Sequence, residues 1–107
     1  MEVYVANAPG DDYDSRPPDD YDSWIDYWNQ LSYPGEERHA TECRKCGEKK
    51  DHNEIEGGHV EYCEKRDGKW YPNREKGIFI VPLCAECNNP NNTDVFSVDD
   101  SELIEIL

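Results

Sequence analysis

Two Cys-x-x-Cys pairs, two apolar segments of strand length and one short amphipathic segment predict a small α+β fold for this chain of 107 residues. Only 36% of the residues are hydrophobic, so apolar burial alone stabilises a domain of this size weakly. A metal ion held by the cysteines would supply folding free energy directly. The sequence therefore predicts one small domain organised around a metal ion.

Charge divides the chain into three segments. Residues 1–37 hold ten acidic residues and one arginine, residues 38–92 hold ten of each sign, and residues 93–107 hold five acidic residues and no basic one. We interpret the middle segment as a neutral module between an acidic, aromatic N-terminal flank and an acidic C-terminal segment. The total charge of -14 opposes non-specific binding of nucleic acid over most of the surface.

The N-terminal flank begins with an acidic repeat and ends in a predicted helix. The motif DDYDS occurs at 11–15 and again at 19–23. Such a proline-containing acidic stretch buries too little apolar surface to fold, so residues 6–20 are expected to be extended or disordered. Residues 23–32 then place aromatic and aliphatic residues at helical spacing, with Ser23 as the N-cap. This amphipathic helix either packs on the neutral module or anchors a partner.

The cysteine pairs have the spacing of a structural zinc site. Each Cys-x-x-Cys pair presents two thiolates from one tight turn, and two such pairs complete a tetrahedral Zn²⁺ site. The predicted ligands are Cys43, Cys46, Cys84 and Cys87. The fifth cysteine, Cys63, is expected to be a buried apolar thiol or a substitute ligand.

Two strands are expected between the cysteine pairs, over residues 55–62 and 77–83. The second is almost continuously apolar, as in a buried strand, and a long polar loop joins the two. The second cysteine pair is then expected at the start of a short helix. This order of knuckle, β-hairpin and short helix predicts a zinc-stabilised treble clef.

Residues 41–92 resemble the HNH, or ββα-metal, endonuclease family. The resemblance rests on the leading Cys-x-x-Cys pair, a histidine in the segment GGHV, and PLCAEC followed by a polar position. It implies that His59 corresponds to the general base that activates water, and that Asn88 takes the place of a metal-ligand histidine. Gly58 stands where the family places an acidic or histidine ligand, so the catalytic set is incomplete.

The sequence therefore favours a non-catalytic zinc-binding module that binds a macromolecular partner. The first alternative is a metal-dependent endonuclease that uses His59 and Asn88, with Mg²⁺ as its catalytic ion. The second alternative is an acidic mimic of nucleic acid that inhibits a nuclease or another nucleic-acid-binding protein. A heparin column separates the nuclease, which needs a basic face, from the other two.

The acidic flanks predict a protein partner with a basic surface, and the charge-balanced middle module leaves nucleic acid as a second kind of partner. The first residues lack the basic start and the apolar stretch of a signal peptide, and no apolar segment is long enough to span a bilayer. We therefore expect a cytoplasmic protein with no membrane partner, in which reduced cysteines hold metal. The partner's identity and the oligomeric state stay open.

Overall fold

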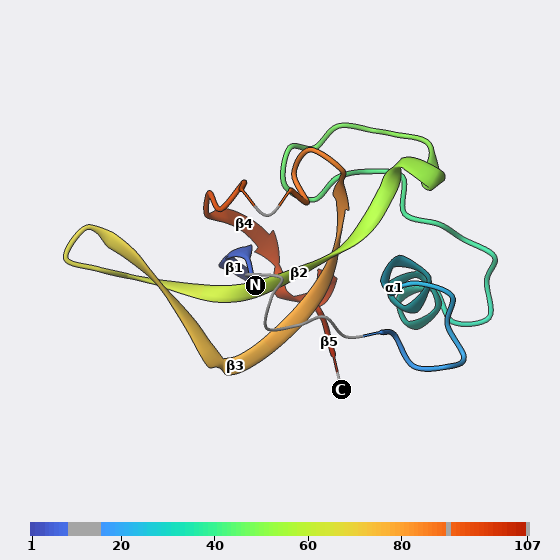
Figure 1. Cartoon of the computed structure of the whole chain (residues 1–107), viewed down its shortest axis with the longest axis horizontal. Coiled ribbons are helices and arrows are strands. Elements are labelled where there is room, and N and C mark those ends of the chain that lie inside the picture. Colours follow the sequence, from blue (N-terminus) through green and yellow to red (C-terminus); the bar gives the residue numbers. More distant parts are fainter. Residues whose placement is uncertain (9–15, 90, 107) are drawn as a thin grey trace.

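The computed structural model describes residues 1–8, 16–89 and 91–106, and it shows a curled antiparallel sheet with one α-helix packed beside it (Figure 1). The five strands follow the order β4-β1-β2-β3-β5. The elements are β1 (Glu2–Asn7), α1 (Trp24–Ser32), η2 (His52–Glu54), β2 (Ile55–Arg66), β3 (Lys69–Cys84), β4 (Phe96–Asp99), η3 (Asp100–Glu102) and β5 (Ile104–Glu105).

The treble clef predicted from the sequence is wrong. A half-barrel of antiparallel strands dominates the structure, and the second cysteine pair lies at a strand end and in the turn over 85–88 instead of at the start of a helix. The reason lies in pairings between distant segments, since strands from both ends of the chain add to the central hairpin. None of the described helices has the length and the apolar composition needed to cross a bilayer.

The longest pairing in the sheet joins β2 to β3 along almost their whole lengths. A two-residue turn connects the strands, and its residues Asp67 and Gly68 have φ values of 52° and 77°. Such positive values are those of the turn that best fits a tight hairpin. The strands expected over 55–62 and 77–83 are therefore parts of longer ones. Of residues 63–76, expected as a loop, all but the two turn residues belong to these strands. The Asp-Gly pair was the sequence signal for this turn.

The N-terminal strand β1 lies inside the sheet, between β2 and β4. Val5 at its centre is fully buried. Ala6 and Asn7, which fall in the segment 6–20 expected to be extended or disordered, are strand residues. The first DDYDS copy, at 11–15, lies outside the described residues. The start of the acidic flank thus belongs to the sheet.

The helix expected over residues 23–32 is present as α1. The side chain of Ser23 caps it by accepting a hydrogen bond from the backbone N–H of Asp26 at 3.1 Å. The helix packs against β2 and β3, where a Cβ atom at Gly57 would lie 2.6 Å from the backbone nitrogen of Ile25. Only glycine allows this close approach, and the helix buries Trp28 in the core.

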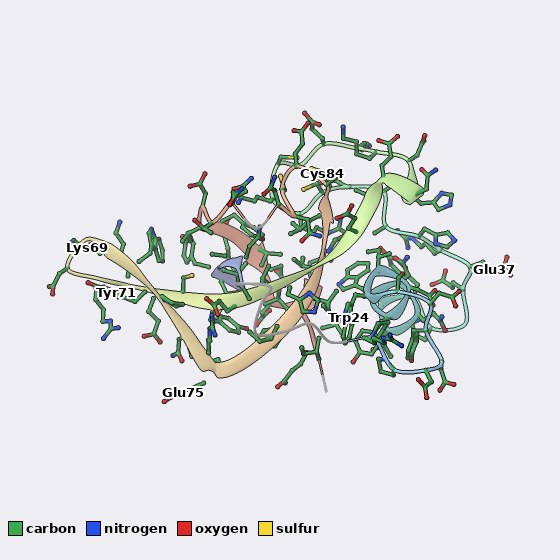
Figure 2. The ribbon with its side chains drawn as sticks, in the orientation of Figure 1. Trp24, Glu37, Lys69, Tyr71, Glu75 and Cys84 are labelled. Atoms are coloured by element: carbon green, nitrogen blue, oxygen red, sulfur yellow. The ribbon has the colours of Figure 1, made fainter. Side chains whose placement is uncertain are left out.

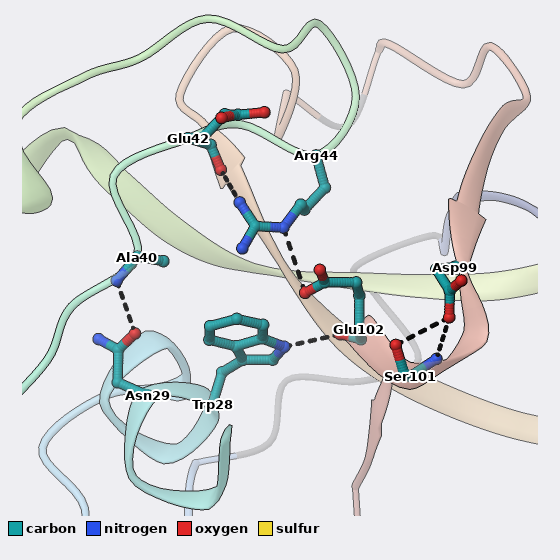
Figure 3. A network of polar contacts seen from close by, with 8 residues as sticks. All are labelled: Trp28, Asn29, Ala40, Glu42, Arg44, Asp99, Ser101 and Glu102. Carbon is teal, nitrogen blue, oxygen red and sulfur yellow. Dashed lines mark hydrogen bonds and ion pairs between the residues drawn. The ribbon is translucent and has the colours of Figure 1, made fainter. Parts of the chain in front are cut away.

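Polar contacts tie α1 to distant parts of the chain (Figure 3). The indole Nε1 of Trp28 donates to the carbonyl of Glu102 at 2.7 Å, and Arg44 Nε donates to the Glu102 carboxylate at 3.3 Å. The side chain of Asn29 accepts a hydrogen bond from the backbone N–H of Ala40 at 2.9 Å. The C-terminal acidic segment therefore supplies two strands and the acceptors that hold the helix in place.

Replacing Trp28 with Ala should lower the free energy of unfolding by about 3–5 kcal/mol, because the change leaves a cavity and an unpaired carbonyl at Glu102. Leu31→Ala on the same helix is the control, since Leu31 is 43% exposed, and it should cost about 0.5 kcal/mol or less. Urea unfolding followed by circular dichroism measures both. Equal losses in the two variants would contradict the packing described here.

Candidate metal centre

Four cysteine sulfurs meet where the end of β3 reaches the loop before β2. The Sγ atoms of Cys43, Cys46, Cys84 and Cys87 all lie within 4.8 Å of one another. The Sγ atoms of Cys46 and Cys84 are 3.9 Å apart, far longer than a disulfide bond. In a tetrahedral site with metal–sulfur bonds of about 2.3 Å, the sulfurs are about 3.8 Å apart. The four cysteines predicted as ligands thus come together in a cluster that can hold a metal ion.

The first cysteine pair lies in a tight turn built by backbone hydrogen bonds. The N–H of Cys43 donates to the carbonyl of Glu48 at 3.0 Å, and the N–H of Gly47 donates to the carbonyl of Cys43 at 2.9 Å. Gly47 has a φ of 78°, which glycine adopts without strain. The turn places the two sulfurs of this pair on the same side, as a shared metal requires.

The second cysteine pair follows β3 directly, with Cys84 as the last residue of the strand. The N–H of Asn88 donates to the carbonyl of Cys84 at 2.8 Å and closes the turn. Asn7 of β1 supports this turn from outside, since its Nδ2 donates to the carbonyls of Cys87 at 2.7 Å and Asn92 at 2.8 Å. Asn7 was missed at the sequence level, because nothing in the N-terminal segment indicates that it reaches residue 87.

The surroundings of the clustered thiols shift their pKa values in different directions. Burial acts to raise the pKa of Cys43, but backbone hydrogen bonds at Cys46, Cys84 and Lys45 and the Cys46 side chain lower this pKa to about 7. Burial and the neighbouring thiols raise the pKa of Cys87. A cation at the centre of the cluster would favour the thiolate forms, because coordination stabilises deprotonated sulfur.

His59 and Asn88, the two residues considered for catalysis, are not brought together. The His59 ring lies 5.3 Å from the ring of Trp24 in α1, while Asn88 donates to the carboxylate of Glu56 at 2.8 Å. Side chains alternate between the faces of a strand, so Glu56 and His59 point to opposite sides of β2. Among the described residues, the buried Nε2 of His59 has no hydrogen-bond partner. The imidazole therefore packs on the helix, whereas Asn88 binds a carboxylate on the other face of β2.

Gly58 stands where HNH endonucleases have an acidic or histidine metal ligand. In this structure the lack of a side chain at Gly58 allows close packing. A Cβ atom there would overlap Cδ1 of Leu83 and would lie 2.8 Å from Oδ1 of Asn88. Leu83 is fully buried, so it has little room to move. A carboxylate or imidazole ligand therefore does not fit at this position.

Cys63 lies outside the four-cysteine cluster. Its half-buried Sγ contacts the carbonyl of Glu61 at 3.9 Å, and burial, followed by the Glu61 charge, raises the pKa of this thiol. It is thus a protonated thiol in the wall of the sheet, not a substitute ligand.

Comparisons with known proteins gave no match to a protein-family model, a curated protein or a solved structure. The resemblance to HNH endonucleases therefore rests on the sequence motifs alone.

The pH dependence of stability should report the buried state of His59. Burial lowers the pKa of His59 below its usual value of 6.5, so the unfolded chain binds the proton more readily as the pH falls. The resulting stability is present above the unfolded pKa and declines below about pH 6.5. His59→Phe, which can still pack on Trp24, should lose less stability than the wild type between pH 7 and pH 5.

Urea unfolding of both proteins at each pH, with the metal content measured in parallel, checks this prediction because thiolates release metal when they protonate. Identical pH dependence of the wild type and His59→Phe would show that the pKa of His59 is the same in the folded and the unfolded chain.

Asn7 should influence metal affinity although it holds no metal. Asn7→Ala removes the donors to the carbonyls of the second turn and should weaken metal binding about 10–100-fold, as is usual for groups that orient ligands. Asn91→Ala makes the same chemical change at an exposed position just after the second cysteine turn and is the control. Competition with a chromophoric chelator measures both affinities, and equal values would remove Asn7 from the site.

Proposed function

We propose that this chain is a non-catalytic binding module whose fold is stabilised by a structural Zn²⁺ ion. The proposal rests on the cluster of four cysteine sulfurs that lie within 4.8 Å of one another. Four protein ligands fill a tetrahedral coordination sphere, whereas catalytic zinc sites keep one position open for water or substrate. The ion would therefore contribute folding free energy and take no part in a reaction.

The ligand chemistry supports zinc over other common ions. Thiolates are soft ligands that select zinc or iron, whereas Mg²⁺ and Ca²⁺ prefer oxygen ligands. Cys43, Cys84 and Cys87 are buried, which shields three of the four sulfurs from solvent. A reducing compartment such as the cytoplasm suits such a site, because it keeps the thiols free to bind metal.

Binding of a macromolecule is the role best supported for the remaining surface. Of the residues considered for catalysis, His59 packs on Trp24 at one face of β2, and Asn88 binds Glu56 at the other face. The aromatic residues of α1 were candidates for contacting a partner. Two of them, Tyr27 and Trp28, are buried in the core and are not available for this contact. A binding surface must therefore lie elsewhere, and the outer half of the β2–β3 hairpin is the part of the fold that is most exposed.

The purified protein should contain one zinc ion per chain. Cys84→Ser removes one of four thiolates and should abolish zinc binding and cooperative unfolding, since metal binding here supplies folding free energy. Cys63→Ser makes the same chemical change outside the cluster and should keep both properties. Elemental analysis and thermal unfolding measure them, and a wild-type protein that stays folded and free of metal under strong chelation would refute the proposal.

A further inference from the structure

Residues 62–77 form an arm that extends beyond the body of the sheet (Figure 1). β1 pairs with β2 only as far as Tyr62. At the same point residues 74–77 of β3 form a bulge and have no partner in β2, because Glu61 pairs with Ile78 and Tyr62 pairs with Asn73. Past this point only the two hairpin strands pair with each other. Residues 64–72 are all exposed. The arm therefore adds little to the core, and its side chains are available for binding.

The arm differs in charge from the rest of the molecule. It contains five basic and three acidic residues, whereas the rest of the chain contains six basic and twenty-two acidic ones. Arg74 near its base forms an ion pair with the buried Glu61 at 2.8 Å. Lys65, Arg66 and Lys69 at its tip form no ion pair within the described ranges. The tip thus presents three cations to solvent.

The length of the arm separates these cations from the acidic body. Strand geometry places the turn at Asp67 about 16 Å beyond Tyr62, at about 3.3 Å per residue. At physiological ionic strength the screening length, over which the interaction between exposed charges decays, is about 8 Å. The tip is therefore about two screening lengths from the body, and it can attract an anion despite the charge of -14.

Each face of the arm combines a cation with an exposed aromatic ring. Lys65 Nζ lies 5.6 Å from the ring centre of Trp70, and Arg66 Cζ lies 4.7 Å from that of Tyr71. Both rings belong to residues that are 39% exposed. Trp70 and Tyr71 are successive strand residues, so they point to opposite faces of the arm. Figure 2 shows Lys69 and Tyr71 at the end of the molecule opposite Trp24 and Glu37.

A shallow groove lies beside Trp70 at the base of the arm. It has a volume of about 210 Å³, and its walls include the side chains of Cys63, Pro72 and Val95. The ring of Tyr4 approaches that of Trp70 to 5.1 Å between centres. This largely apolar recess between aromatic and aliphatic side chains suits a flat ring.

We propose that the arm binds single-stranded nucleic acid, with bases stacked on its aromatic residues and phosphates held by its cations. This inference rests on the proposed function as a binding module and names its partner. Exposed rings beside Lys and Arg are the combination that binds single strands, because stacking uses the faces of the bases and the cations neutralise phosphates. A duplex keeps its base faces stacked inside, and an acidic polypeptide offers charge without flat rings. The two exposed rings therefore favour a single strand.

The test uses the full-length, zinc-loaded protein and a fluorescent oligothymidylate of about 12 nucleotides, with binding followed by anisotropy. With three phosphate contacts, the logarithm of affinity should fall with the logarithm of salt concentration with a slope of about -2. Lys65→Glu with Lys69→Glu should weaken binding at least about 10-fold and flatten this slope. The control, Arg16→Glu with Arg38→Glu, makes the same change in net charge at exposed positions off the arm and should retain binding.

Trp70→Ala tests stacking apart from charge. It should weaken binding about 10-fold and leave the salt slope unchanged, because stacking on an aromatic ring releases no counterions. Leu31→Ala removes an exposed apolar side chain from α1 and is the matched control. Zinc content and thermal unfolding of every variant show that the fold is intact.

Four results would overturn the inference. Equal binding of polyglutamate and oligothymidylate would show a site for acidic chains in general, and tighter binding of duplex DNA would show that stacking is not used. Light scattering that shows salt-dependent self-association, lost in the lysine variant while oligothymidylate does not bind, would identify a second copy of this chain as the partner. A folded, zinc-loaded protein that fails to bind refutes only the arm inference, whereas a metal-free folded protein refutes the proposed function.

Discussion

The pairing of β2 with β3 is the constraint on which the rest of the structure depends. One end of this hairpin delivers Cys84 to the sulfur cluster, and the other end forms the arm. One face of β2 accepts α1 at Gly57, while its edge pairs with β1. Because so many elements share one antiparallel ladder, a shift of a single residue in its register would move the cysteines and the helix contacts together.

The core that covers this hairpin is small, and specific polar contacts supplement it. Trp28 fills the space between α1 and the sheet, and its indole N–H is satisfied by a carbonyl from η3. Asn7 joins the first strand to the second cysteine turn in a similar way. These contacts connect segments that lie 74 and 80 residues apart, so each closes a long loop of chain. A metal ion bound by the four sulfurs would close a further loop of the chain. Such a bond would help a chain with few hydrophobic residues to reach a defined fold.

The structure separates the cysteine cluster from the most exposed part of the fold. Three of the four cysteines are buried and Cys46 is exposed, so most of the cluster is shielded from solvent. The arm, in contrast, leaves its side chains in solvent and carries positive charge on a molecule that is otherwise strongly acidic. A rigid scaffold with an exposed, chemically distinct extension is a common way to place a binding surface on a small domain.

The sequence alone determined the features that depend on neighbouring residues. The Cys-x-x-Cys spacing identified the four cysteines that cluster, and the Ser23 cap with its helical pattern identified α1, because both follow from local geometry. The Asp-Gly turn was also readable from sequence, although the hairpin around it was predicted as a loop. Only the tertiary structure decided that β1 pairs inside the sheet and that the chain forms a half-barrel instead of a treble clef. It also decided that His59 packs on Trp24 while Asn88 binds Glu56. Those outcomes depend on which distant strands pair and on which face each side chain then occupies, and no local pattern specifies either.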